Sequence, residues 1–490
     1  MIYSNPDFII LFIVTLASFL IVRSYNIRFY FLLLASIFFY SRSGLEDTLI
    51  FFSVIIVSWL ATLLADKIPH HKHKFLNFGI ILMVLHLFFW KYSSWALQNI
   101  QEIFPHFLNG RTINLPLPVG ISFFTLQGIA YLVDFGLGDA GFISFREYLL
   151  FKSFFPQLVA GPIVRSHQLM PQLKSLATPK PKDLGIGVML FVSGFFKKLV
   201  VADRLAPFID TIFRSPRVYS RGTLILGIVG YTIQIWADFS GYTDMGRGAA
   251  RMLGIVIPEN FLSPYLSRTP SEFWRRWHIT LSEWIRDYIF TPLCFTALPF
   301  NRILMALLIT MTISGLWHGA SWTFLIFGLY HGGLLVMEAY LKKSQLNLWF
   351  KKSFNEFGRS ILLWMMMSTG VALGCLVFRS QTIRTLRIYL RGVALGSGIQ
   401  SLPEATGPIL WATGFSVVLN LLLYKSFSSG KYWASDIKDH FYPPTLQASL
   451  PRIDTRTWGV VCGVGCALVF IAAIFFRNTA KAQAFIYFQF

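Results

Sequence analysis

The chain has 490 residues, of which 54% are hydrophobic and only 13% are charged, and its formal net charge is +20. Soluble proteins carry about 25% charged residues, so this composition excludes a water-soluble globule, and its hydrophobicity excludes disorder. The sequence therefore indicates an integral membrane protein. Its basic excess fits cytoplasmic loops and contacts with anionic membrane lipid. No nucleic-acid-binding motif is found, so we expect no nucleic acid partner.

Apolar stretches recur along the whole chain. A membrane-spanning helix needs about 20 apolar residues, and on that basis we predict about eleven or twelve such helices. They lie near residues 8–22, 29–41, 48–65, 75–90, 115–135, 184–202, 223–239, 302–316, 321–340, 360–378, 409–424 and 457–476. The apolar stretch 147–175 is broken by three prolines, which predicts a re-entrant or interfacial element buried in protein. The expected fold is all-α and polytopic, with one integral membrane domain over residues 1–490.

The charged loops suggest an orientation. No basic residue precedes the first apolar stretch, whereas Arg23 and Arg28 follow it. We therefore expect a retained first helix with the N-terminus outside. The basic loops 66–74, 341–359 and 425–456 then fall in the cytoplasm. Four arginines disagree with this count, namely Arg379, Arg384, Arg387 and Arg391. Either an interfacial amphipathic helix or one miscounted span would explain them.

Histidine and cysteine are common metal ligands, but both have simpler interpretations in this sequence than a metal site. His70, His71 and His73 lie in a lysine-rich loop without a cysteine partner, which favours a solvated loop. The four cysteines form no CxxC pair and lie in or beside apolar stretches; they are Cys294, Cys375, Cys462 and Cys466. Buried apolar packing is their expected role. The sequence predicts no metal site and no disulfide.

A first polar cluster is Ile313–Trp322, with the sequence ISGLWHGASW. His318 lies where one apolar run ends and the next begins, with Ser314 and Trp317 before it. Polar residues inside membrane domains are costly and point to function. Sequence context alone supports two interpretations equally, a core histidine hydrogen-bonded between helices and a catalytic histidine. His331, in the following apolar run, is expected to have a packing or hydrogen-bonding role.

A second cluster is Ser271–Asp287, with the sequence SEFWRRWHITLSEWIRD. At 100° per residue, a helix would place Trp274, Trp277 and His278 on one face. An aromatic and basic helix suits a membrane interface, which is the simpler interpretation. In the functional interpretation, His278 points into a cavity and arginines bind the phosphates of a donor. The candidates at such a donor channel are Trp274, Arg275, Arg276, Arg286 and Asp287.

A third cluster is Gln234–Arg251, which contains Asp238 and Asp244 within or just after an apolar run. Arg247 and Arg251 are candidate partners for these carboxylates. The glycines of this segment are expected to loosen the helix. A structural salt-bridge network is at least as well supported here as direct chemistry.

Missing motifs narrow the chemistry. The chain has no GxxxxGKS phosphate loop, no GxSxG nucleophile elbow and no HExxH helix. A histidine without a nearby serine or cysteine nucleophile favours direct transfer, with the histidine as general base.

Several long strings resemble the membrane-bound O-acyltransferase family, in its alginate O-acetyltransferase branch. In chain order they are LPVGISFFTLQGIAYLVD, FFPQLVAGPIVR, SGFFKKLVVAD, DFSGYTDM, PENFLSPYLSRTPSEFWRRWHITLSEWIRDYIFTPL, LWHGASWTFLIFGLYHG and the C-terminal FIYFQF. The resemblance covers about two thirds of the chain. The segment Cys294–Leu304 departs from the Gly-Gly-Asn-Arg pattern common in this branch, and residues from about 380 to 480 match weakly.

The resemblance implies a specific fold and activity. It implies a ring of tilted helices around a central tunnel, with a catalytic core near residues 115–340 and variable helices near 360–490. His318 takes the position of the family's essential histidine, and His278 that of a second histidine. A cytoplasmic thioester, acetyl-CoA or an acyl carrier, would be the donor, and no cofactor would be bound permanently. The protein would lie in a bacterial inner membrane and pass acetyl groups, through a periplasmic partner protein, to an acceptor polysaccharide.

The acceptor is not readable from the sequence. The strings sit closer to the alginate type, while relatives acetylate peptidoglycan or cellulose or transfer D-alanine to teichoic acid. A secondary transporter or flippase, and a scaffold of an export complex, are the alternatives from other classes. Transporters often contain two repeated halves, and none is visible here.

Overall fold

The computed structural model describes residues 3, 5–104, 115–294, 299–344, 355–396 and 398–428. Within these ranges the chain is helical and has no strand, apart from two isolated bridges that pair Tyr219 with Gln400 and Phe261 with Trp277. The prediction of an all-α fold is thus confirmed. The predicted span 457–476, the FIYFQF tail, Cys462 and Cys466 lie outside the described residues, as does nearly all of the basic loop 425–456.

The chain divides into two compact units. Unit 1 comprises Met1–Phe195 and Tyr242–Pro258, and unit 2 comprises Phe196–Gly241 and the chain from Glu259 onward. The helices of unit 1 are α1 (Pro6–Ile21), α2 (Tyr25–Ser41), α3 (Leu45–Lys67), η1 (Pro69–His71), α4 (Lys72–Ile103), α5 (Ile121–Leu137), α6 (Phe145–Ser153), α7 (Phe155–Leu158), α8 (Ser166–Leu173) and α9 (Pro181–Phe196, whose last residue belongs to unit 2). Helix α11 (Arg221–Met252) begins in unit 2 and ends in unit 1.

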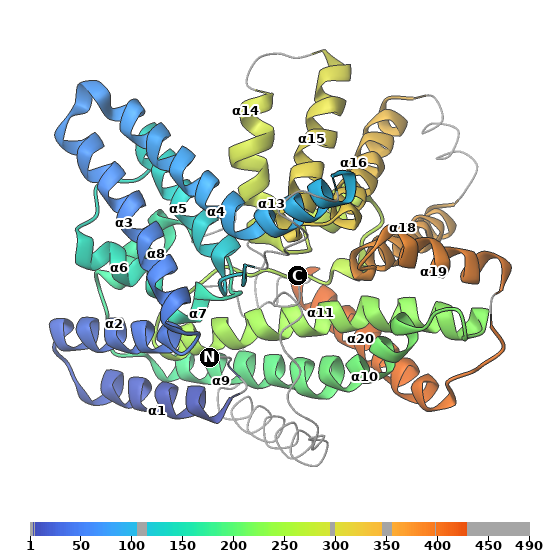
Figure 1. The fold of residues 1–490 in the computed structure, drawn as a ribbon. Helices are drawn as coiled ribbons and strands as arrows, with labels where there is room; N and C mark the ends of the chain where they lie inside the picture. The colour runs from blue at the N-terminus through green and yellow to red at the C-terminus, as the bar shows by residue number, and fades with distance from the viewer. Residues whose placement is uncertain are drawn as a thin grey trace. The chain divides into compact units, whose positions relative to one another are not determined.

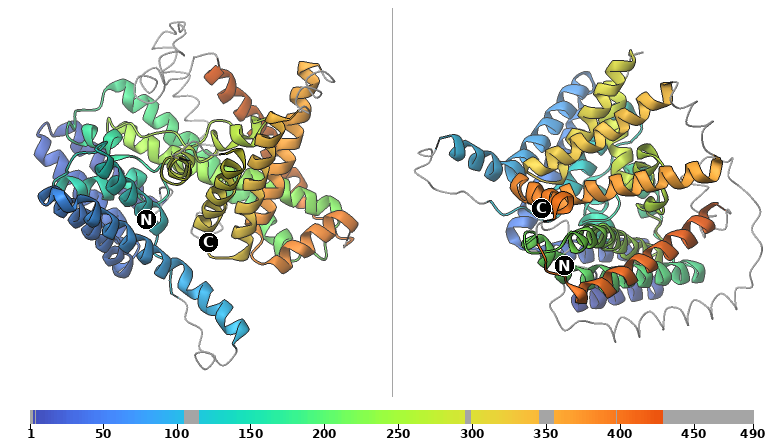
Figure 2. Two further views of the ribbon diagram at one scale, coloured as in Figure 1. Left: turned by 90° about the horizontal axis from the view of Figure 1, so that it is seen from above. Right: turned by 90° about the vertical axis from the view of Figure 1, so that its right-hand side faces the viewer.

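The remaining helices belong to unit 2. They are η3 (Lys197–Ala202, a π-helix), α10 (Asp203–Arg214), η4 (Pro264–Leu266), α12 (Pro270–Trp274), α13 (Ile279–Ile285), η5 (Arg286–Phe290, also a π-helix), α14 (Thr291–Leu293), α15 (Phe300–His318), α16 (Trp322–Lys343), α18 (Glu356–Arg379), α19 (Ile383–Leu395) and α20 (Pro403–Ser428). Figures 1 and 2 show α15, α16 and α18 side by side.

Seven helical segments in the described ranges are long and apolar enough to span a membrane. They are Leu45–Lys67, Pro69–Ile103, Pro181–Arg214, Arg221–Met252, Phe300–His318, Trp322–Lys343 and Glu356–Arg379. Two further apolar helices, α1 and α5, are shorter at 16 and 17 residues. Every predicted span within the described ranges overlaps a helix, although residues 115–120 of the span 115–135 precede α5. The predicted spans 29–41 and 409–424 lie on α2 and α20, which are not among the candidate spans. The protein is therefore a multi-pass membrane protein.

Short helices occupy the proline-broken stretch in unit 1. Helices α6, α7 and α8 cover it, and buried groups satisfy their backbone. The Tyr3 hydroxyl donates to the Phe155 carbonyl oxygen at 2.9 Å, and the Gln157 side-chain amide donates to that of Phe151 at 2.6 Å. This fits the expected irregular element buried in protein, because such backbone must find partners inside the protein.

Two further predictions concern the surface. The histidine cluster lies exposed in η1 and at the start of α4, and no group of three or more potential metal ligands occurs among the described residues. Helix α19 is amphipathic, with Leu386 and Tyr389 buried. Its arginines are exposed, namely Arg384, Arg387 and Arg391. An amphipathic helix, one of the two explanations offered for these arginines, is thus present, and the count of spans stays open.

The glycines near the end of α11 have a different role from the predicted one. Instead of loosening the helix, which continues to Met252, they allow close packing within unit 1. A Cβ on Gly246 would lie 2.5 Å from the Pro156 carbonyl oxygen, and one on Gly248 would lie 2.6 Å from that of Gly187. Only glycine leaves room for such neighbours.

Glycines also bring α15 and α16 together in unit 2. A Cβ on Gly315 would lie 2.4 Å from the Phe324 carbonyl oxygen, and one on Gly328 would lie 2.5 Å from that of Met311. Small residues at helix crossings are the usual means of close packing in membranes. Because α15 ends at His318, this crossing also fixes the position of that histidine.

The crossing predicts the effect of a single methyl group. Gly328→Ala should destabilise the protein by about 1–3 kcal/mol, because the backbone of α15 must move. Gly333→Ala on the same helix is the matched control, since a Cβ there meets nothing within 4 Å. Thermal unfolding in detergent should show a lower midpoint for Gly328→Ala and an unchanged or higher midpoint for Gly333→Ala. Equal midpoints for the two variants would contradict the packing role.

Candidate functional site

The two histidines predicted to be catalytic lie on either side of one tryptophan in unit 2. The ring centroid of Trp317 is 6.0 Å from that of His278 and 5.0 Å from that of His318. The His278 side of this group comes from the loop before α13, and the His318 side from the end of α15. Both histidines are buried. The fold thus brings together two histidines that are 40 residues apart in the sequence.

His318 lies in an aromatic environment. Its ring makes edge-on contacts with Phe378 at 5.2 Å and Phe327 at 5.7 Å. It also borders an apolar cavity of about 20 Å³, which is room for about one water molecule. The cavity is lined by Ile235, Phe273, Trp274, Trp277, His318, Phe327, His331, Val371, Cys375 and Phe378.

His331 forms another part of the cavity wall. Its ring stacks on Phe273 with an interplanar angle of 9° and lies 5.2 Å from the ring of Trp274. These contacts fit the packing role predicted for His331. The structure also shows that His331 lines the same cavity as His318. Helix α12, which carries both aromatics, is tied to α16 by Glu338, whose carboxylate accepts from the Ser271 backbone N–H at 2.7 Å and hydroxyl at 2.6 Å.

One wall of the cavity was not predicted to belong to the site. Val371, Cys375 and Phe378 come from α18, an apolar helix whose sequence carries no polar cluster. Their spacing places them on one face of a helix. This periodicity does not distinguish a cavity wall from ordinary packing, so only the packed structure assigns them to the site.

The continuous helix predicted across the second cluster is wrong. Helix α12 ends at Trp274, and α13 begins at Ile279. Between them His278 has φ 44° and ψ 54°, in the left-handed region. Residues other than glycine rarely adopt this conformation and do so mainly where the surroundings enforce it, often at functional sites. The helical spacing that placed Trp274, Trp277 and His278 on one face therefore does not apply across this break.

A neighbouring loop imposes this conformation from both sides of His278. Before the histidine, the Leu262 backbone N–H donates to the Arg276 carbonyl oxygen at 2.9 Å. After it, the Ile279 N–H donates to the Asn260 carbonyl oxygen at 3.0 Å. The Asn260 side-chain oxygen also accepts from Thr280, at 3.1 Å from the backbone N and 2.7 Å from the hydroxyl. Tertiary hydrogen bonds thus override the local helical preference.

Asn260 should therefore position His278. In Asn260→Ala the Thr280 N–H and hydroxyl lose a buried acceptor, which costs about 1–3 kcal/mol. Thr280→Val removes only the hydroxyl bond and should cost less. We expect the rate of the reaction at this site to fall more in Asn260→Ala than in Thr280→Val, with the substrate KM changing little. Equal rates in both variants and the wild type would contradict this role.

Burial determines the protonation state of His278, which lies in none of the seven candidate membrane spans. Removal from water lowers its pKa to about 3, since a low-dielectric site disfavours the charged form. His278 is therefore neutral at pH 7. It can donate or accept a hydrogen bond without carrying charge.

The arginines of the second cluster do not share one environment. Arg276 pairs with Glu272 at 3.0 Å, and exposed Arg286 pairs with its neighbour Asp287 at 2.7 Å. Arg275 is exposed and borders none of the described cavity around His318. Trp274 does line that cavity, and Ser314 lies buried in α15, one turn before His318. The structure thus gathers the aromatic and histidine candidates more closely than the charged ones.

The carboxylates of the third cluster form salt bridges. In unit 1 Asp244 pairs with Arg247 at 3.3 Å. In unit 2 Asp238 pairs with Lys198, at 2.8 Å, and Lys198 also contacts Asp203 at 2.8 Å. The structural salt-bridge interpretation is therefore the better one for these residues, although the partner of Asp238 is a lysine of η3 and not one of the two predicted arginines.

Comparison with known proteins identifies the family. The sequence profile of the MBOAT, membrane-bound O-acyltransferase family matches residues 138–378. The chain is 31% identical to the peptidoglycan O-acetyltransferase of Helicobacter pylori, with 87% of this chain and 86% of that protein aligned. It is 33% identical to the probable alginate O-acetylase AlgI of Azotobacter vinelandii, over 70% of this chain and 69% of that protein. The chain belongs to the membrane-bound O-acyltransferase family.

Membership makes the protein an O-acyltransferase. A more distant relative is the teichoic acid D-alanyltransferase of Bacillus subtilis, 27% identical over 67% of this chain and 83% of that protein. The family match covers His278, His318 and the cavity residues of unit 2.

Proposed function

We propose that this O-acyltransferase moves acetyl groups from a cytoplasmic thioester donor, acetyl-CoA, for O-acetylation of a cell-envelope polysaccharide. The observation that carries the proposal is the group of His278, Trp317 and His318, with His318 at an apolar cavity. Relatives named as acetyl transferases align at higher identity than the D-alanyl transferase does. Acetyl is therefore the acyl group to test first.

His318 acts as the general base in this proposal. Its imidazole takes the proton of an acceptor hydroxyl while that oxygen attacks the thioester carbonyl carbon. The tetrahedral intermediate then collapses, the C–S bond breaks, and the thiolate leaves with the proton from His318. General base catalysis contributes typically about 10²–10⁴-fold. Since the cavity has room for about one water molecule, aromatic side chains must move to admit an acetyl group.

His278 has a separate role in this proposal. It is neutral and fixed by its backbone, so it serves to orient the acceptor or the carbonyl by a hydrogen bond. The donor reaches the site from the cytoplasm, and the acceptor or a periplasmic partner protein from the opposite side. Arg275, Arg276 and Arg286 remain candidates for the donor phosphates. The inner membrane location and the outside N-terminus belong to the same proposal.

Labelled acetyl transfer tests the activity. Membrane vesicles that contain the protein, its partner and the acceptor should incorporate radiolabel from [¹⁴C]acetyl-CoA into polymer or partner protein. Labelled D-alanine on a carrier protein is the competing donor. If label is incorporated from the D-alanyl donor alone, the transferred group is D-alanyl and the proposal of acetyl transfer is wrong.

The acceptor requires a comparison of cells. Mass spectrometry of envelope polysaccharides, with and without the gene, should show loss of O-acetyl from one polymer. An alginate-like exopolysaccharide is the first acceptor to test. Peptidoglycan is the second, because the relative that acts on it aligns over 87% of this chain. Unchanged acetylation of every envelope polymer would contradict the proposal.

A further inference from the structure

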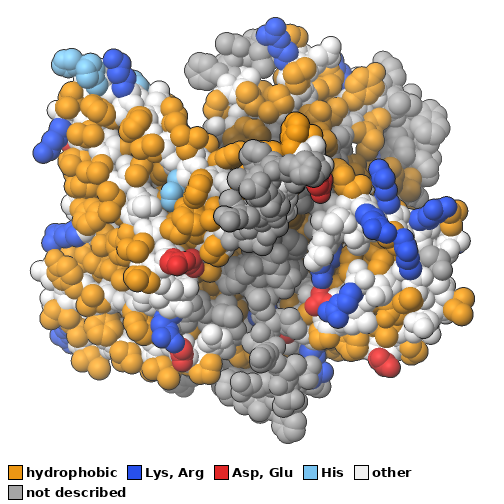
Figure 3. Space-filling view, viewed as in Figure 1, with side chains coloured by type: hydrophobic (Ala, Val, Ile, Leu, Met, Phe, Trp, Pro, Cys, Tyr) orange, Lys and Arg blue, Asp and Glu red, His pale blue; other side chains and the backbone are white. Residues whose placement is uncertain are grey.

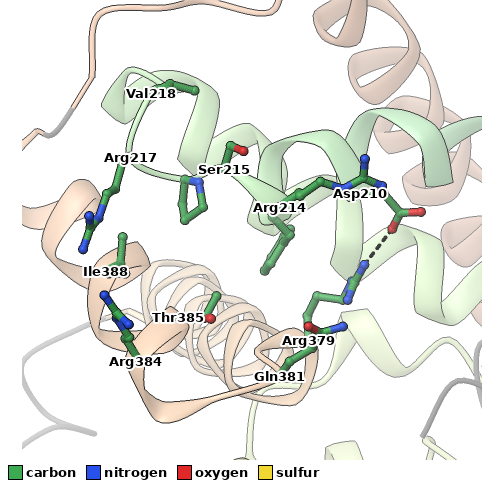
Figure 4. A pocket seen from close by; sticks show the side chains of 12 residues that line it. Asp210, Arg214, Ser215, Arg217, Val218, Arg379, Gln381, Arg384, Thr385 and Ile388 are labelled. Carbon is green, nitrogen blue, oxygen red and sulfur yellow. Dashed lines mark hydrogen bonds and ion pairs between the residues drawn. The ribbon is translucent and has the colours of Figure 1, made fainter.

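An arginine-lined pocket lies in unit 2 among residues outside the catalytic proposal. It measures about 660 Å³ and is formed by the end of α10, the turn before α11 and the start of α19. Four arginines and one aspartate line it. Figure 3 shows basic side chains gathered over α19, and Figure 4 shows the pocket from close by.

Only one of the four arginines is neutralised by a carboxylate of the pocket. Arg379 pairs with Asp210 at 2.6 Å, and its guanidinium lies over the ring of Phe213. Arg217 and Arg384 lie together on the side of the pocket away from that pair (Figure 4). No ion pair links either of them, or Arg214, to a carboxylate among the described residues. Three arginines in one concave site without a balancing carboxylate indicate an anionic ligand.

The pocket is built on fixed backbone. The turn before α11 is held by the segment after α19, because the Ser220 N–H donates to the Gln400 carbonyl oxygen at 2.8 Å and the Gln400 N–H to that of Val218 at 3.1 Å. Beneath it, Phe213 stacks on Tyr389, whose hydroxyl donates to the Leu224 carbonyl oxygen at 2.8 Å. The arginine side chains therefore extend from a preformed framework.

The membrane-spanning segments place this framework at a membrane surface. Two of the candidate spans end at Arg214 and Arg379, and a third begins at Arg221. Residues at the ends of spans lie at the depth of lipid headgroups. Helix α19, which supplies Arg384, is amphipathic and suits the same layer. No acidic residue occupies its first turn, so an anion would also complement the positive end of that helix.

We propose that this pocket binds a phosphate group of an anionic ligand at the membrane surface. Guanidinium groups bind phosphate by paired, charge-assisted hydrogen bonds, and Ser215 and Thr385 add hydroxyl donors in the same pocket. The phosphate comes either from an anionic phospholipid headgroup or from a soluble phosphate compound. The proposal does not rest on the acyl group or on the acceptor of the enzyme.

Two double variants test the site. Arg217→Gln with Arg384→Gln removes two pocket charges, whereas Arg387→Gln with Arg391→Gln removes two exposed charges of α19 that do not line the pocket. Each arginine that hydrogen-bonds a bound phosphate contributes about tenfold or more to binding. We therefore expect the pocket variant to bind phosphate roughly 100-fold more weakly, whereas the control variant, whose arginines do not line the pocket, should lose only a small part of the general surface attraction.

Two probes distinguish the sources of the phosphate. Electron paramagnetic resonance of spin-labelled phosphatidylglycerol, compared with phosphatidylcholine in vesicles, measures selection of an anionic headgroup. Titration calorimetry with pyrophosphate in a zwitterionic detergent measures binding of a soluble phosphate. Loss of either interaction in the pocket variant alone supports the site and names its source. Wild-type protein that binds neither probe, or equal losses in the two variants, would overturn the proposal.

Discussion

His318→Ala should reduce acetyl transfer by about 10²–10⁴-fold, the usual contribution of a general base. The imidazole is the proton acceptor proposed for the attacking hydroxyl, and alanine leaves no group in its place. His318 is buried between Phe327 and Phe378, so the loss of its ring also leaves space in the site. The rate should be measured with [¹⁴C]acetyl-CoA at saturating donor, where loss of the base lowers kcat.

Controls must separate chemistry from folding. His318→Gln keeps a polar side chain of similar length and should lose as much activity as alanine, because an amide is not a base at pH 7. His167→Ala, at an exposed histidine of α8, should retain wild-type activity. Equal amounts of each protein in the membrane and equal unfolding midpoints make the comparison valid. Near-normal transfer by folded His318→Gln would exclude the base assignment.

The sequence predicted which residues belong to the site, but it did not predict how the backbone positions them. His278 and His318 stand out because polar residues are scarce in the apolar chain, and the structure places both beside Trp317. The break at His278 was missed, because helical periodicity considers only local spacing. The bonds from Asn260, 18 residues earlier in the chain, form only in the folded protein.

The partners of charged residues were harder to predict than the positions of the apolar helices. Apolar length located the long apolar helices, since each described span overlaps one. Partners of charged residues depend on which helices pack together, so Asp238 pairs with Lys198 and not with an arginine of its own cluster. In the same way, the wall that α18 adds to the cavity has no polar signature in the sequence.

His278→Asn should lose most of the acyl-transfer activity while keeping the fold, with an expected effect of about 10²-fold if His278 orients the reacting groups. Asparagine tolerates the left-handed conformation that His278 adopts at φ 44°. The backbone set by Asn260 is therefore retained, and only the imidazole is lost. Alanine does not tolerate the left-handed conformation in this way, so His278→Ala should lose stability as well as activity. Wild-type activity in His278→Asn would show that His278 has a structural role and does not orient the reacting groups.

The pH dependence of stability gives the same substitution an independent readout. Burial lowers the pKa of His278 to about 3 in the folded protein, against an ordinary value of 6.5. Below pH 6.5 the unfolded chain gains a proton that the folded chain excludes, so stability is present above that pH and is lost as the pH falls. Each pH unit between these pKa values costs about 1.4 kcal/mol. The unfolding midpoint of the wild type should therefore fall between pH 6.5 and 4.5 more steeply than that of His278→Asn, since asparagine does not titrate. If the midpoints of the wild type and of His278→Asn fall equally with pH, His278 is hydrated in the folded protein. Burial would then not keep its imidazole neutral.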